Sequence, residues 1–203
     1  MVTATVVPLN ADFESGFAQD PAGVAQSVEL AIEAGVAGLS IEDSTGDAAH
    51  PMYDVDAAVE RIRAARRAVD RAGGEVLLVG RAECFLLGRP YIDETIVRLK
   101  AYADAGADCL YAPGVKTREQ IELLVEAVAP KPLNLLVGWA SDLTVADIAA
   151  MGVRRISIGG ALARTAWGGF LRAARALATE GRFDAFGEAA PGAELNGLFQ
   201  LLR

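Results

Sequence analysis

The fold is decided by the stretch Ala34-Gly35-Val36-Ala37-Gly38-Leu39-Ser40-Ile41-Glu42-Asp43-Ser44. Its first glycine follows a segment with apolar residues at helical spacing, and a glycine just past a helix end supplies the left-handed turn that reverses the chain. An apolar run then leads to two acidic residues. This order of helix, glycine turn, strand and polar loop is typical of a βα unit in a parallel sheet.

The same pattern recurs along the chain. Short runs rich in β-branched or aliphatic residues predict six strands, over residues 2–9, 38–41, 75–79, 108–111, 133–137 and 155–158. Between them, apolar residues three and four apart predict helices within residues 24–32, 55–69, 92–103 and 121–128. Thr117 with Gln120, and Thr144 with Asp147, have the spacing of helix starts. The residues alone therefore predict an α/β fold with six βα units, whereas a closed (β/α)8 barrel has eight strands and typically about 250 residues.

The composition excludes several classes of protein. The chain has 203 residues, of which 52% are hydrophobic, and 19 Lys and Arg against 27 Asp and Glu give a net charge of −8. Such an acidic chain repels phosphate backbones and anionic headgroups, so we expect neither nucleic acid nor a membrane as a partner. No apolar run approaches the ~20 residues that span a bilayer, and the start lacks the basic region of a signal peptide. We expect one cytoplasmic domain over residues 1–203.

Charged side chains follow three consecutive predicted strands. Asp12 and Glu14 follow the first, Glu42 the second and Arg81 the third. Because neighbouring parallel strands lie ~5 Å apart, carboxylates at their ends would converge and repel one another unless a cation or protons neutralise them. Mg2+ takes such oxygen ligands and needs only one or two direct carboxylates. Each group also has a structural alternative: a polar turn for Asp12 and Glu14, a solvated loop for Glu42, and a surface ion pair for Arg81. The position of Arg81 beside the acids also suits a bidentate clamp on a substrate carboxylate or phosphonate.

Other motifs carry less information. His50 is the only histidine, so a zinc site built from several histidines is excluded, and its setting in a predicted loop does not favour a Ser-His-Asp triad. Gly159-Gly160 follows the last predicted strand and precedes a helix, where it suits either a phosphate-binding turn or close packing of strand and helix. We add Gly159 as a substrate-binding candidate on this basis.

Several segments together carry a family resemblance. They are Pro8-Leu9-Asn10-Ala11-Asp12-Phe13-Glu14-Ser15-Gly16-Phe17, Leu39-Ser40-Ile41-Glu42-Asp43-Ser44, Gly80-Arg81-Ala82-Glu83, Gly106-Ala107-Asp108 through Pro113-Gly114, Pro132-Leu133-Asn134, and Arg155-Ile156-Ser157-Ile158-Gly159-Gly160. In these segments, which span nearly the whole chain, the sequence resembles the isocitrate lyase and phosphoenolpyruvate mutase superfamily.

The resemblance implies a (β/α)8 barrel that acts on α-oxo or 2-hydroxy acids. It implies Mg2+ ligands at Asp12, Glu14 and Glu42, catalytic roles for Arg81 and Glu42, and a substrate pocket that Arg81 and Asn134 line. In such a site the metal lowers the energy of the enolate that develops as a carbon-carbon or carbon-phosphorus bond breaks.

The chain departs from the family at three places. It lacks the Lys and Cys of the family's Lys-x-Cys-Gly-His-like loop, and Gly114 replaces an acid, so isocitrate and methylisocitrate lyase activities are not expected. The first run aligns with the family's third strand, so we expect an N-terminally truncated barrel that lacks the first two βα units.

These observations favour a Mg2+-dependent lyase or decarboxylase of a small oxo acid, such as oxaloacetate or phosphonopyruvate. One alternative is a truncated barrel with weak or no activity that binds small acids or a partner chain. Another is a phosphate-binding barrel that uses Gly159-Gly160 and needs no Mg2+. Residues 161–179 and 195–202 carry Leu and Phe side chains that we expect to be exposed. Members of the family that the chain resembles use C-terminal helices for assembly, so the resemblance implies a homo-oligomer.

Overall fold

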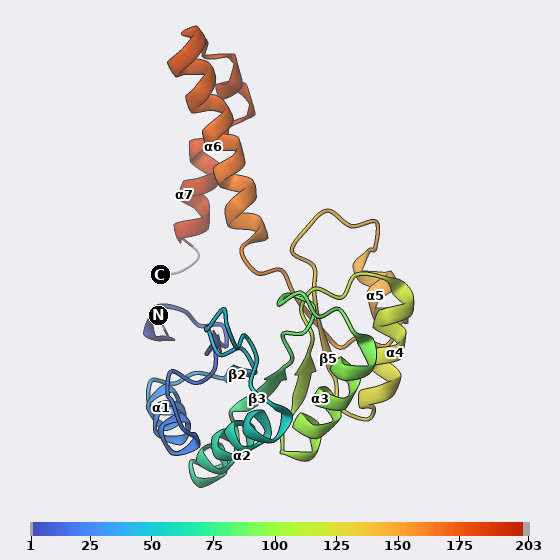
Figure 1. Ribbon diagram of the computed structural model, residues 1–203. Helices are drawn as coiled ribbons and strands as arrows, with labels where there is room; N and C mark the ends of the chain where they lie inside the picture. Colours follow the sequence, from blue (N-terminus) through green and yellow to red (C-terminus); the bar gives the residue numbers. More distant parts are fainter. Residues whose placement is uncertain (1, 201–203) are drawn as a thin grey trace. The chain divides into compact units, whose positions relative to one another are not determined.

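The computed structural model describes residues 2–200, which form two compact units (Figure 1). The first unit ends at Ser157 and the second begins at Ile158. All the strands described in residues 2–200 belong to the first unit. The expectation of a single domain concerns the whole chain and stays a prediction.

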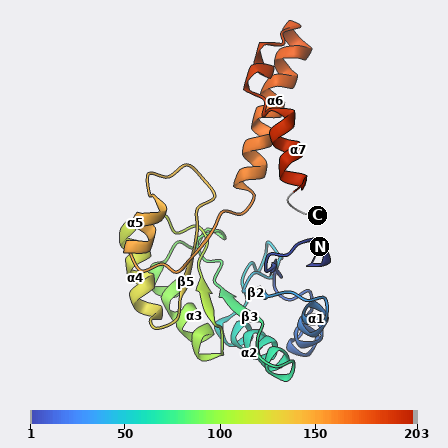
Figure 2. The same cartoon turned by 180° about the vertical axis from the view of Figure 1, so that it is seen from behind.

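A parallel sheet is the framework of the first unit. Its six strands lie side by side in the order of the sequence. They are β1 (Asn10–Asp12), β2 (Gly38–Glu42), β3 (Leu77–Arg81), β4 (Cys109–Tyr111), β5 (Leu133–Leu136) and β6 (Arg155–Ser157). The sheet curls into an open half-barrel, which can be followed from both sides in Figures 1 and 2. The predicted α/β fold, an incomplete (β/α)8 barrel with six βα units, is therefore confirmed.

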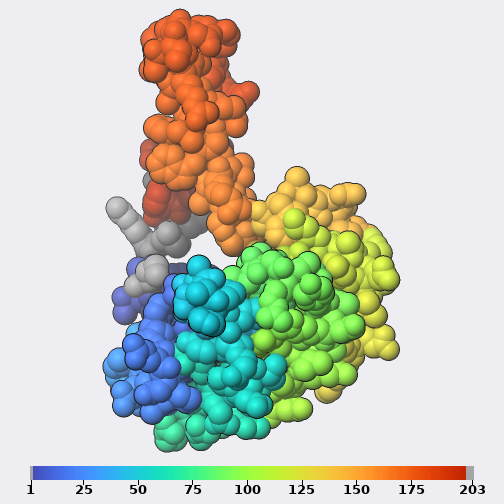
Figure 3. All heavy atoms as spheres, viewed as in Figure 1, coloured from blue at the N-terminus to red at the C-terminus, as the bar shows by residue number. Residues whose placement is uncertain are grey.

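Helices connect successive strands and cover the outer face of the sheet. They are α1 (Pro21–Glu33), α2 (Val55–Arg71), α3 (Ile92–Asp104), α4 (Arg118–Val128) and α5 (Val145–Ala150). Neighbouring helices from α1 to α4 pack against each other, and Figure 3 shows α2 to α4 as adjacent patches on one face of the unit. Both predicted helix starts are confirmed, because Thr117 and Thr144 each accept a hydrogen bond from the backbone three residues on.

One glycine turn shows why the recurring glycines are needed. Gly106 ends the turn after α3 with a φ of +103°, which residues with a side chain rarely adopt. A Cβ at this position would also lie 2.6 Å from Cγ of Arg66 on α2. Gly106 therefore lets the chain turn from α3 into β4 while it passes close to Arg66 of α2.

The two faces of the sheet differ in chemistry because side chains alternate along each strand. The face toward the helices is apolar and holds residues that are at most 3% exposed, namely Leu39, Ile41, Leu78, Leu110, Leu133 and Leu135. The concave face is polar toward the carboxyl ends of the strands, where it carries Asp12, Ser40, Glu42, Arg81, Tyr111, Asn134 and Ser157. The packing of the first face therefore fixes which residues line the second.

The first strand differs from its prediction. Residues 2–9 were expected to form it, but Val2–Ala4 form a 3-10 helix and β1 begins at Asn10. The partner strand explains the difference, because β2 starts at Gly38, which pairs with Asn10. Residues upstream of Leu9 thus face no described strand with which to form a ladder, and Val6 and Val7 are 95% and 65% exposed.

The second unit is built from two helices and a short 3-10 helix. These are α6 (Ala161–Glu180), η2 (Asp184–Glu188) and α7 (Gly192–Gln200). None of its residues from 158 to 199 is buried, although many are large and apolar, including Trp167, Phe170 and Phe199. Within residues 2–200, no helix combines the length and the apolar character needed to cross a membrane.

Candidate active site at the carboxyl ends of the strands

The carboxyl ends of β1, β2 and β3 bring three of the predicted site residues together. Asp12 pairs with Ser40, and Glu42 pairs with Arg81, in the registers of neighbouring strands. Side chains at paired positions point to the same face of a parallel sheet, which here is the concave one. The Ser40 hydroxyl donates a hydrogen bond of 3.4 Å to Asp12 Oδ1.

Arg81 lies at the centre of this group. Its Nη1 atom is 3.2 Å from Asp12 Oδ1 and 3.2 Å from Glu42 Oε2, while Nε donates to Glu83. The guanidinium carbon lies 5.1 Å from the centre of the Tyr111 ring. Burial alone would lower the pKa of Arg81, but the Glu83 and Glu42 carboxylates outweigh burial and raise it above its usual value. Arg81 is therefore a fixed positive charge among acids.

Glu83 is a site residue that the sequence prediction left out. It is only 4% exposed, and its carboxylate pairs with Nε of Arg81. Its backbone N–H donates a 2.8 Å hydrogen bond to Oδ1 of the buried Asp43. The signal was present in the sequence, because alternate residues of an extended chain share a face and Glu83 stands two positions after Arg81.

Glu42 carries the strongest electrostatic perturbation among the predicted ligands. Burial raises the pKa of its carboxyl to about 7, because the ionised form loses contact with water. Arg81 opposes this rise, whereas Glu83, Asp12 and Glu14 reinforce it. The acids of the site are thus only partly neutralised by the single guanidinium.

Glu14 is placed differently from the other two predicted metal ligands. Its backbone has a φ of +46°, and its carbonyl accepts a 2.9 Å hydrogen bond from the Glu42 N–H. Its exposed side chain forms no hydrogen bond or ion pair with the described residues. The carboxylate is nevertheless close enough to raise the pKa of Glu42.

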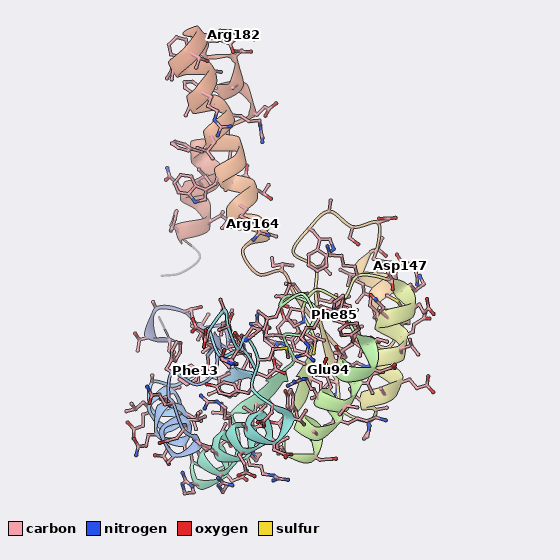
Figure 4. The ribbon with its side chains drawn as sticks, viewed as in Figure 1. Phe13, Phe85, Glu94, Asp147, Arg164 and Arg182 are labelled. Carbon is pink, nitrogen blue, oxygen red and sulfur yellow. The ribbon has the colours of Figure 1, made fainter. Side chains whose placement is uncertain are left out.

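A buried arginine positions the loop that carries Glu14. Arg61 of α2 is 2% exposed and donates hydrogen bonds of 2.6, 2.5 and 3.1 Å to the carbonyls of Ser15, Ala18 and Gln19. These bonds satisfy backbone groups that the turn leaves without partners. Figure 4 labels Phe13 in the same loop and Phe85 in the segment that follows β3.

Asn134 lies further along the concave face, on β5. It is 1% exposed, and its Nδ2 donates a 2.9 Å hydrogen bond to Ser157 Oγ on β6. Its Oδ1 is buried without a hydrogen-bond partner among the described residues. A buried acceptor that lacks a partner is unfavourable, so this atom is suited to a donor from water or a ligand. Gly159, the other predicted substrate contact, belongs to the second unit, and its role stays a prediction.

The donor set fits a hard divalent cation in its chemistry. Asp12, Glu42 and Ser40 offer only oxygen atoms, which are the ligands that such a cation prefers. In residues 2–200, however, no three His, Cys, Asp or Glu side chains form a group with the geometry of a metal site. Arg81 separates the carboxylates of Asp12 and Glu42 instead.

Sequence comparison identifies the family to which this geometry belongs. The model of the phosphoenolpyruvate phosphomutase family matches residues 1–178. This chain belongs to the phosphoenolpyruvate phosphomutase family. The resemblance stated from the sequence motifs is thereby confirmed.

Individual members of the phosphomutase family and superfamily resemble the chain along most of its length. An oxaloacetate decarboxylase of Paraburkholderia xenovorans (strain LB400) is 31% identical over 156 residues, which are 74% of this chain and 49% of that protein. A solved structure from Burkholderia cenocepacia J2315, provisionally described as a lyase or mutase, has 46% identity and a TM-score of 0.90 over 95% of this chain and 69% of that one. Oxaloacetate acetylhydrolase in complex with its product oxalate has 31% identity and a TM-score of 0.79, over 96% and 66% of the two chains. The chain thus spans about half the length of the curated relatives that it matches.

Proposed function

We propose that the chain is a Mg2+-dependent lyase or decarboxylase that cleaves a carbon-carbon bond, or a carbon-phosphorus bond, of a small α-oxo acid. The observation that carries the proposal is the placement of Arg81 among Asp12, Glu42 and Glu83 on the concave face. An arginine beside crowded carboxylates can bind an anionic substrate next to a divalent cation. The oxaloacetate decarboxylase and oxaloacetate acetylhydrolase among the relatives support an oxo acid as the substrate.

Asp12 and Glu42 would hold the cation, with Glu14 as a third acid beside them. Bound there, Mg2+ would supply a Lewis acid that stabilises negative charge on the substrate's oxo oxygen. The protein's part is to keep both carboxylates in place. The registers of β1 and β2 do so for Asp12 and Glu42, and the hydrogen bond between Glu42 N–H and Glu14 carbonyl ties the Glu14 loop to β2.

Arg81 and Asn134 would orient the substrate. The Arg81 guanidinium has donors to spare for a carboxylate, because its Nη2 atom bonds to none of the described residues, and Glu83 keeps its Nε end in place. The unpaired Asn134 Oδ1 would accept a hydrogen bond from a substrate hydroxyl or a bound water. Arg81 and Glu42 are therefore the residues through which we expect the protein to act on the reacting group.

A substrate panel tests this proposal. The purified chain is assayed for turnover of oxaloacetate, phosphonopyruvate and 2-hydroxy diacids with Mg2+ and with a chelator, and Asp12→Ala serves as the control. We expect turnover that requires Mg2+ and is lost in the variant. Turnover without Mg2+, or full activity of Asp12→Ala, would remove the metal from the proposal.

A second candidate is a chain that binds small acids without converting them. The observation in its favour is the open sheet, in which β1 and β6 are edge strands among the described residues. A barrel that is not closed leaves its interior and edges without partners. Binding of oxalate to a chain that turns over no member of the panel would favour this candidate.

We also propose that the chain forms a homo-oligomer through its second unit. Trp167 and Phe170 pack edge to face yet are 61% and 59% exposed, and Phe183 and Phe186 form a second exposed pair. A hollow of about 500 Å³ lies between α6 and η2. Apolar groups on this scale gain stability when another copy covers them. Light scattering is expected to give a molar mass that is a multiple of 21.2 kDa, and Trp167→Glu should lower this mass. A wild-type chain that is monomeric would contradict the proposal.

A further inference from the structure

Arg81 occupies the space between two of the proposed magnesium ligands. A single atom, Nη1, contacts Asp12 Oδ1 and Glu42 Oε2, each at 3.2 Å. The two carboxylates come from different strands, so the guanidinium bridges β1 and β2. Within residues 2–200, Arg81 is the only cationic side chain that forms an ion pair with either acid. It thus pairs with the oxygens that a metal ion would take.

The other end of the guanidinium is held by separate contacts. Nε pairs with Glu83, and the guanidinium lies against the ring of Tyr111. Glu83 is itself fixed, because it is 4% exposed and its N–H donates to the buried Asp43. A guanidinium has five N–H donors in a rigid plane, so the contacts of Nη1 can be lost while the contact of Nε remains.

Arg81 and a divalent cation compete for the same oxygens. Both bind carboxylates, but like charges that share one small space repel each other, so they cannot both lie between Asp12 and Glu42. Mg2+ carries twice the charge of a guanidinium and binds carboxylate oxygens at shorter distances, near 2.0–2.1 Å as an order of magnitude. The ion would therefore displace Nη1 rather than bind beside it.

We propose that Arg81 is an internal cation that bridges Asp12 and Glu42 and that Mg2+ displaces from these two carboxylates. The inference rests on the proposed function. Displacement releases Nη1 on the concave face while Glu83 keeps Nε in place, and Nη1 can then bind the carboxylate of an oxo acid. Mg2+ and the substrate carboxylate each make the binding of the other more favourable, since both favour the same displaced position of Arg81.

The test is the Mg2+ affinity of the full chain, measured by isothermal titration calorimetry at about pH 8.5, where carboxylates are ionised. Arg81→Gln removes the charge and keeps a polar side chain. One neighbouring opposite charge lowers the proton affinity of a carboxylate by roughly 10-fold or more, so we expect Mg2+ to bind the variant at least about 10-fold more tightly than the wild type. The same variant should lose turnover.

Arg63→Gln is the matched control. It makes the same change in net charge, but Arg63 pairs with Glu60 on an exposed face of α2, where both side chains are about half exposed. A distant exposed charge is screened by salt, so its removal should change the Mg2+ affinity by less than about twofold. Circular dichroism spectra that superimpose on the wild type show that each variant is folded.

The outcomes separate this inference from the proposed function. Mg2+ binding that is unchanged or weaker in folded Arg81→Gln overturns the displacement of Arg81 and leaves the metal site standing. Absence of Mg2+ binding in every chain, or equal binding by Asp12→Asn, overturns both. If Arg81→Gln does not fold, NMR of the wild type with 15N-labelled arginine decides, with the signal assigned from Arg81→Lys. A shift of the Arg81 side-chain signal on adding Mg2+ supports displacement, and an unchanged signal overturns it.

Discussion

Glu42→Gln is expected to lower Mg2+-dependent turnover of oxaloacetate by at least about 100-fold, the scale on which loss of one preorganised electrostatic contact acts in an enzyme site. The amide keeps the size of the side chain, which is 13% exposed, but it cannot carry the negative charge that would hold a metal ion. It also removes one of the carboxylates that bind Nη1 of Arg81. Steady-state kinetics at saturating Mg2+ measure the effect.

Glu60→Gln serves as the control for Glu42→Gln. It makes the same chemical change at an acid on α2 that is about half exposed and pairs only with Arg63 among the described residues. Its kcat/KM should stay within about twofold of the wild type, because exposed ion pairs contribute little. Turnover of Glu42→Gln within about threefold of the wild type would contradict the role assigned to Glu42.

Glu42→Gln should also alter how the free energy of unfolding depends on pH. Burial raises the pKa of Glu42 from 4.5 to about 7, so the folded chain holds this proton more tightly than the unfolded chain does. The unfolded state loses the proton first as the pH rises, and stability therefore falls between about pH 4.5 and pH 7, by up to the order of 3 kcal/mol from this group. Urea unfolding in a chelator should show a shallower fall in Glu42→Gln.

Much of the fold could be predicted because its signals are local. The alternation of Leu39 and Ile41 with polar residues, and the glycine turn at Gly35, are sufficient to place β2 and the end of α1. The start of β1 could not be predicted in the same way. The start of β1 depends on where its partner strand β2 begins, and the local sequence of residues 2–9 carries no information about that pairing.

The site was predictable only in part for a related reason. Glu42 and Asp43 are adjacent acids, and nothing in their local sequence shows that their environments differ. In the structure, Glu42 points to the concave face at the end of β2, whereas Asp43 is buried under α3. The partners of Asp43 are Arg98 and Tyr102, which lie 55 and 59 residues further on. A helical pattern predicts α3 without showing which of its polar residues reaches the sheet.

We expect the largest loss of stability when the buried ion pair of Asp43 and Arg98 is broken. Asp43 and Arg98 have side chains that are 1% and 5% exposed, and Arg98 Nη1 lies 3.2 Å from Asp43 Oδ2. Arg98→Met preserves the apolar stem but leaves a buried carboxylate without its cation. Breaking one partner of a buried ion pair costs about 3–5 kcal/mol, so the free energy of unfolding measured in urea should fall by that amount.

Two further variants show whether the loss comes from the buried pair itself. Tyr102→Phe removes only the hydroxyl that donates to Asp43 Oδ2 at 2.5 Å and should cost about 1.5–3 kcal/mol, the range for hydrogen bonds to charged groups. Arg63→Met breaks the half-exposed pair with Glu60 and should cost less than about 1 kcal/mol. If Arg98→Met were no more destabilising than Arg63→Met, Asp43 would have to be held by Tyr102 and the Glu83 N–H alone.

Asp43 also accepts a hydrogen bond from the backbone of Glu83, whose carboxylate pairs with Arg81. Arg98→Met should therefore also loosen Arg81, and the variant should lose turnover under conditions where it remains folded.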